Sequence, residues 1–153
     1  TYFYGGEATF HYHPHFLHNL HLESNFSYLF AENNSNLPIS SVPQPKLMTL
    51  ITYDIKSKSQ FIPKSFAIQN SYFAEQLRVI TNEIPTEAYN LLDLGAYWEI
   101  KTEKLKGTLK IGARNILNSD YINHLSELKP LGIQNPGRNF YITLNLNINQ
   151  KIK

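Results

Sequence analysis

The chain has 153 residues, of which 42% are hydrophobic and only 17% charged, below the roughly 25% of an ordinary soluble domain. It contains no cysteine, which excludes disulfides and cysteine-based zinc sites, and its net charge of +2 comes from scattered basic residues that form no tract suited to nucleic acid. No run of about 18 apolar residues occurs, so a transmembrane helix is also excluded.

Alternation of apolar and polar residues predicts seven β-strands, because successive side chains of a strand point to opposite faces. In chain order, the predicted strands are residues 7–13, 20–30, 47–53, 66–74, 92–100, 108–114 and 139–148. Residues 121–129 could turn helically, and no other helix is expected. The last strand is the clearest, since it alternates without interruption.

The apolar residues that alternate along the strands are expected to contact lipid, and those of the last three strands are the named candidates. In each of these strands, leucine, isoleucine, phenylalanine or tryptophan alternates with polar or small residues. The candidate lipid-facing residues are Leu92, Leu94, Trp98, Leu109, Ile111, Phe140, Ile142, Leu144, Leu146 and Ile148.

The connections between the strands alternate in length along the chain. Residues 14–19, 56–61 and 101–106 form short connections, and residues 31–45, 75–88 and 118–137 form long ones. Up-and-down transmembrane barrels have short periplasmic turns and long outer loops, so the alternation is typical of that fold. The predicted fold class is therefore all-β, an antiparallel up-and-down transmembrane β-barrel of which this chain supplies a fragment of about seven strands.

Several segments in the second half of the chain resemble TonB-dependent outer-membrane receptors. Residues 83–94, EIPTEAYNLLDL, are similar to a loop and strand entry of that family. Residues 112–118, GARNILN, followed by Asp120 and Tyr121, resemble its penultimate strand. The segment His124-Leu125-Ser126, residues 136–140 and the alternating tail resemble its final loop and strand. The chain departs from the family pattern at Ile116-Leu117, where Leu-Phe is usual, and in its non-aromatic end.

The resemblance implies that residues 1–153 are the carboxy-terminal segment of a barrel of about 22 strands, whose plug domain is absent from this chain. The start at Thr1, without an initiator Met or a leader, also indicates a piece of a longer protein. The implied partners are the lipid bilayer, the upstream plug and remaining strands, the TonB energy-transducing complex, and a small-molecule nutrient. By family frequency this nutrient is an iron-siderophore complex, and the implied location is the outer membrane of a Gram-negative bacterium.

Five of the six histidines, at positions 11, 13, 15, 18 and 21, cluster around the first predicted turn. Imidazole is a common ligand of zinc, copper and haem iron. His11 and His13 would share the polar, lumenal face of one strand, but no carboxylate or thiol completes a defined coordination set. Polar wall and turn residues are therefore favoured over a metal site, and no metal or cofactor is predicted.

No pattern in the sequence indicates an enzyme. Serine, histidine and aspartate occur only in unrelated segments, and there is no phosphate-binding loop, His-Glu-x-x-His motif or dinucleotide fingerprint. We therefore expect a chain without catalytic residues. Exposed polar residues of the long loops are the candidate contacts to a nutrient: Asn33, Asn36, Arg78, Asn82, His124 and Lys129.

Two other architectures fit the same alternation. A soluble small β-barrel or β-sandwich carrier would turn its apolar faces inward to line a cavity for an apolar ligand, and it would need no detergent. An independent eight-stranded membrane barrel would require a first strand that pairs with the last.

Overall fold

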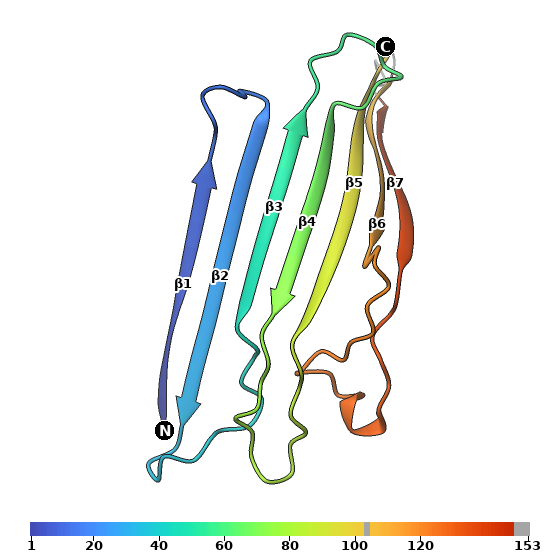
Figure 1. Cartoon of the computed structure of the whole chain (residues 1–153). Helices are drawn as coiled ribbons and strands as arrows, with labels where there is room; N and C mark the ends of the chain where they lie inside the picture. Colours follow the sequence, from blue (N-terminus) through green and yellow to red (C-terminus); the bar gives the residue numbers. More distant parts are fainter. Residues whose placement is uncertain (103–104, 149–153) are drawn as a thin grey trace, which may run out of the picture.

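The computed structural model describes residues 1–102 and 105–148 and contains an antiparallel sheet of seven strands. Each strand is hydrogen-bonded to its neighbours in the sequence, so the order is β1 to β7 without a crossover (Figure 1). The strands are Tyr2–Tyr12 (β1), Leu20–Glu32 (β2), Lys46–Asp54 (β3), Ser65–Phe73 (β4), Tyr89–Lys101 (β5), Leu105–Arg114 (β6) and Asn139–Ile148 (β7). The predicted all-β, antiparallel, up-and-down fold is confirmed.

The first strand begins at Tyr2, earlier than the predicted start at Glu7. Gly5 and Gly6 interrupt the apolar alternation, and glycine is depleted in strands. Gly5 nevertheless pairs with Leu29, so close to the neighbouring backbone that a Cβ at Gly5 would lie 2.3 Å from the carbonyl oxygen of Tyr28. Gly5 is therefore explained by the close approach of β1 to the backbone of β2, although local propensity places this residue in a turn.

The connections lie at opposite ends of the sheet according to their length. Residues 33–45, 74–88 and 115–138 form the long loops at one end, and residues 13–19 and 55–64 form turns at the other, as Figure 1 shows. The third short connection includes residues 103–104, which lie outside the described residues. The predicted alternation is confirmed for the connections that the structure describes.

The predicted helical turn over residues 121–129 is wrong in its position. Residues 121–128 are irregular, and a single 3₁₀ turn follows at Lys129–Leu131, with Pro130 in its first positions. Gly132 ends this turn with φ +68°, a left-handed conformation that glycine adopts without strain. In the part of the chain that the structure covers, no helix is long and apolar enough to cross a membrane.

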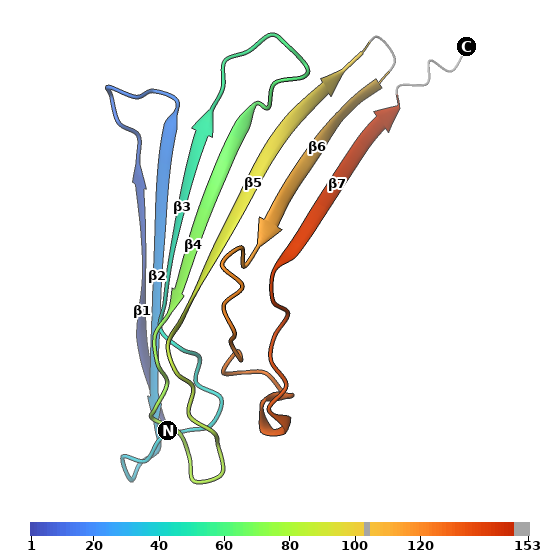
Figure 2. The same ribbon diagram turned by 45° about the vertical axis from the view of Figure 1, so that its right-hand side comes forward.

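The strand register separates the side chains into two faces, because residues directly opposite each other in a ladder project to the same side. The apolar face consists of the even-numbered residues of β1, β2, β4, β5 and β7 and the odd-numbered residues of β3 and β6. The remaining strand residues form the polar face. The apolar face continues across all seven strands, and the sheet curves gently along its width (Figure 2).

No second layer covers this sheet in the described part of the chain. The exposed surface is 11105 Å², whereas a folded soluble monomer of this length exposes about 8,000 Å². Only Ala31, Val42 and Ala113 are buried hydrophobic residues among those described. Strands β1 and β7 are the two edges and do not pair with each other. The described residues therefore form neither the inward-facing cavity of a soluble carrier nor a closed eight-stranded barrel.

Candidate functional site

The predicted lipid-facing residues lie together on the apolar face. On β5 to β7 they occupy adjacent rungs, such as Trp98 opposite Leu109 and Leu109 opposite Leu144. Phe140 and Ile142 are each 73% exposed, so no other part of the described chain covers them. Ile148 is the last residue of β7, and its side chain lies outside what the structure describes. Contact of this face with lipid stays a prediction.

The apolar faces predicted for the first four strands belong to the same surface. It continues through large exposed side chains of β1 to β4: Tyr4, Phe10, Tyr12, Phe26, Tyr28, Leu47, Ile51, Tyr53, Phe66, Ile68 and Tyr72. Two polar side chains on this face, Ser24 and Thr49, lie within hydrogen-bond distance of each other, with Oγ and Oγ1 3.1 Å apart. An exposed apolar surface of this extent is typical of a face that contacts another protein or a membrane.

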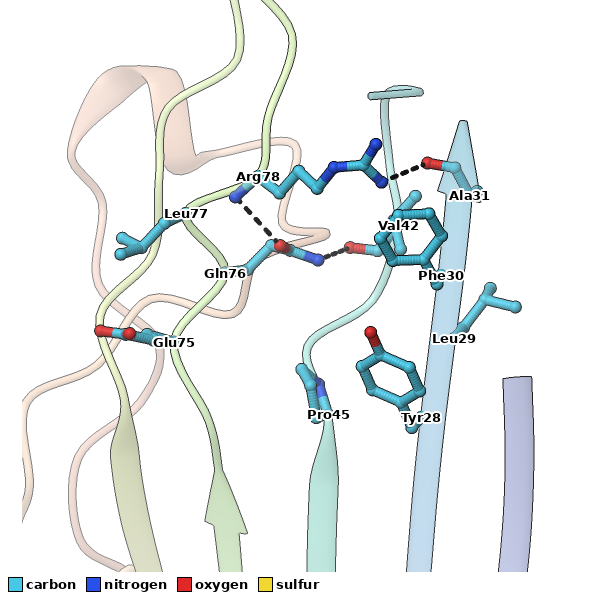
Figure 3. A pocket seen from close by; sticks show the side chains of 10 residues that line it. All are labelled: Tyr28, Leu29, Phe30, Ala31, Val42, Pro45, Glu75, Gln76, Leu77 and Arg78. Carbon is cyan, nitrogen blue, oxygen red and sulfur yellow. Dashed lines mark hydrogen bonds between the residues drawn. The ribbon is translucent and has the colours of Figure 1, made fainter. Parts of the chain in front are cut away.

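A cavity of about 280 Å³ lies beside the end of β2, between that strand and the loops of residues 33–45 and 74–88, and Figure 3 shows its lining residues. The Arg78 guanidinium stacks 3.9 Å above the Phe30 ring and donates hydrogen bonds to the carbonyl of Ala31 (3.1 Å) and to Glu32 Oε2 (2.8 Å). Gln76 Nε2 donates to the Val42 carbonyl at 3.2 Å. Arg78, which was predicted as an exposed loop residue that contacts the nutrient, therefore connects the loop of residues 74–88 to the end of β2.

A buried polar cluster joins the second and third long loops. The Lys129 ammonium donates to the Ile84 carbonyl and to Thr86 Oγ1, and it lies 3.0 Å from His124 Nδ1. Because an ammonium can only donate, His124 Nδ1 is the acceptor, and the proton of the neutral ring is on Nε2. That Nε2 lies 3.3 Å from Glu83 Oε1, although it makes no hydrogen bond.

The expectation that His124 and Lys129 are exposed is wrong, because they are only 5% and 7% exposed. Burial lowers the pKa of His124, the Lys129 charge lowers it further, and Glu83 opposes both. Burial also lowers the pKa of Lys129, again against Glu83. The cluster therefore places the Lys129 amine and the His124 imidazole, both with a lowered pKa, beside the Glu83 carboxylate between two loops.

The structure brings together three of the six predicted nutrient contacts. Asn82, His124 and Lys129 line a cavity of about 300 Å³ between the three long loops. Asn33 instead shapes its own turn, because its Oδ1 accepts from the backbone N–H groups of Ser35 (2.8 Å) and Leu37 (3.0 Å). Asn36 has φ +58°, a turn conformation that asparagine tolerates. Nutrient contact by any of these residues stays a prediction.

At the opposite end of the sheet, His13 and His21 lie close to the carboxylate of Asp54, which was not predicted from the sequence. His13 Nδ1 and His21 Nδ1 lie 2.6 Å apart, and His21 Nε2 lies 3.0 Å from Asp54 Oδ2. On the next rung, His11 Nδ1 lies 3.7 Å from Glu23 Oε2. Asp54 is remote in sequence and reaches His21 only through the pairing of β2 with β3. Among the described residues, no three His, Asp or Glu side chains converge as a ready metal cage.

No protein-family model and no curated protein matches the sequence. Among solved structures, the fold is similar to that of the copper transporter OprC, with a TM-score of 0.77 over 93% of this chain. The chain is a barrel segment by fold. The sequence identity to OprC is 18%, and the match spans only 23% of that transporter's chain, so the likeness concerns the fold alone.

Proposed function

We propose that this chain forms part of the membrane-spanning wall of an outer-membrane transporter barrel in a Gram-negative bacterium. The apolar face carries this proposal, because it is continuous over seven strands and remains exposed in the described chain. In a bilayer, strands must have every backbone group paired, which only a closed barrel achieves. The remaining strands of the same protein would pair with β1 and β7 to close it.

We infer further that the parent protein is a TonB-dependent receptor and that this chain is its carboxy-terminal barrel segment. Support comes from the family-like segments at residues 83–94, 112–118 and 136–140 and from the similarity in fold to a transporter. The partners would be an upstream plug domain and the TonB energy-transducing complex acting through it. In this role the chain is a passive wall and not an enzyme.

An iron-siderophore complex is the first nutrient to test, because the sequence resemblance implies it. Copper is the second, because the similar solved structure is named a copper transporter. The cavity between the long loops offers Asn82, Glu83 and His124, which could contact either nutrient at the outer face.

Uptake by cells that express the full-length parent tests this function. Radiolabelled iron-siderophore and copper are supplied separately to cells with and without a functional TonB protein. We expect one nutrient to accumulate only when both the parent and TonB are present. Equal accumulation without TonB would contradict an energy-coupled receptor, and the two nutrients distinguish the substrate class.

A further inference from the structure

The pair formed by His13 and His21 has a geometry that transport through a barrel wall does not require. His13 directly follows the last residue of β1, and His21 lies on the polar face of β2. The two rings meet edge to face, with centroids 4.7 Å apart and planes inclined by 76°. This arrangement directs the two Nδ1 atoms at each other.

The carboxylate of Asp54 fixes the tautomer of His21. Because a carboxylate only accepts, His21 Nε2 carries the proton in the 3.0 Å contact, and Nδ1 of the neutral ring has a free lone pair. His13 Nδ1, 2.6 Å away, must then donate its proton to that lone pair. A single proton thus joins two nitrogen atoms that would otherwise repel each other.

We propose that His13 and His21 bind a late first-row transition-metal cation such as Zn²⁺ through their Nδ1 atoms, with Asp54 as the positioning residue. Histidine ligands of metals usually donate their second ring N–H to a carboxylate, which orients the ring and makes it a better ligand. Asp54 already holds His21 in this way. The proposal goes beyond the uptake function and does not depend on which nutrient is imported.

Binding requires only a small movement. Two imidazole nitrogens on a tetrahedral zinc ion lie about 3.3 Å apart, so the present 2.6 Å separation must widen by roughly 0.7 Å. His13 follows the strand and is exposed, so its ring can rotate away from His21. The proton of His13 moves from Nδ1 to Nε2 through solvent, so the neutral pair loses no proton when the cation enters.

The surroundings favour an open, exchangeable site over a structural one. Water would complete the coordination, because no third protein ligand converges in the described part of the chain. Asp54 and Glu23 provide negative charge, and the side chains of His21 and Asp54 are 38% and 52% exposed, which leaves a path for the cation. Two neutral imidazoles select zinc, copper or nickel over magnesium and calcium.

Calorimetric titration of the full-length parent in detergent with Zn²⁺ alone tests the site. His13→Gln and His21→Gln should each remove one Zn²⁺ equivalent per protein relative to the wild type. Asp54→Asn should keep the stoichiometry but weaken the affinity roughly 10- to 100-fold, because only the orientation of His21 is lost.

His11→Gln is the matched control, because it removes an imidazole that is two residues from His13 and on the polar face of β1 but outside the pair, and it should keep the full stoichiometry. A stoichiometry unchanged in both pair variants would overturn the proposal. An equal loss in His11→Gln would also overturn it, since a diffuse histidine-rich segment would then be binding zinc. If His21→Gln fails to fold, His13→Gln decides, because His13 lies beyond the paired residues of β1.

Discussion

Gly95, Gly112 and Tyr141 occupy one rung of β5, β6 and β7 on the polar face. The tyrosine ring lies across the two glycines, so that a Cβ at Gly112 would lie 2.6 Å from Tyr141 Oη and 2.5 Å from the Leu94 carbonyl oxygen. An aromatic ring over a glycine covers backbone that the missing side chain leaves exposed. The role of Gly112 therefore depends on a residue that pairs with it from the next strand.

Replacing Gly112 with alanine should destabilise the barrel, because the added methyl group must displace Tyr141 and the backbone of β5. Overpacking of this kind costs roughly 1–3 kcal/mol. Urea unfolding of the full-length parent in detergent measures the change. Gly6→Ala is the matched control, since a Cβ at Gly6 meets nothing within 4 Å. Equal effects of the two substitutions would contradict the packing described for Tyr141.

Leu144 and Thr143 are neighbours on β7 with side chains on opposite faces. If the apolar face meets lipid, Leu144→Lys should cost roughly 2–4 kcal/mol when the residue lies near the bilayer midplane. Thr143→Lys should have a small effect, because its side chain would point into the wet lumen. Folding titrations into lipid vesicles compare the two variants, and equal tolerance would contradict a lipid-facing Leu144.

At the scale of the elements, the loops of residues 74–88 and 115–138 pack against each other around the titratable side chain of His124. The pKa of His124 is lowered below its usual 6.5, mainly by burial and then by Lys129, against Glu83. Since the unfolded state binds this proton more readily, the packing is fully stable above about pH 6.5 and weakens as the pH falls through the lower folded pKa. The contact between residues 74–88 and 115–138 should therefore loosen in acid.

Hydrogen exchange of residues 115–138 as a function of pH measures this loosening. Protection factors, the intrinsic exchange rate at each pH divided by the observed rate, should fall on acidification in the wild type. His124→Gln should remove most of this pH dependence while Lys129 and Glu83 remain. Wild-type protection factors that do not change with pH would show that protonation of His124 does not open the loops.

The strands and their faces were largely predictable, because local alternation determines them. The long loops were not, because their contacts join residues far apart in sequence, such as Thr86 with His124 and Arg78 with Glu32. Polar loop residues are usually exposed, so the burial of Lys129 has no local signal in the sequence. Asp54 was also not predicted as a histidine partner, because it lies far from His21 in the sequence.

At the scale of the whole molecule, the large exposed surface and the open edges of the sheet fit the proposal that this chain is part of a larger barrel. Strands β1 and β7 leave backbone groups unpaired, and each such group costs several kcal/mol in hydrocarbon. In the proposed barrel, the apolar face would contact lipid, and the polar face, with charged residues such as Glu7, Lys110 and Arg114, would contact water. A barrel wall between a bilayer and a water-filled lumen provides both environments.

Fractionation of cells that express the full-length parent, followed by electrophoresis with and without heating, tests the central claim most directly. We predict recovery in the outer-membrane fraction and a migration that shifts on heating, because a closed barrel stays folded in detergent until it is heated. Recovery in the soluble fraction, with no shift on heating, would contradict the membrane barrel.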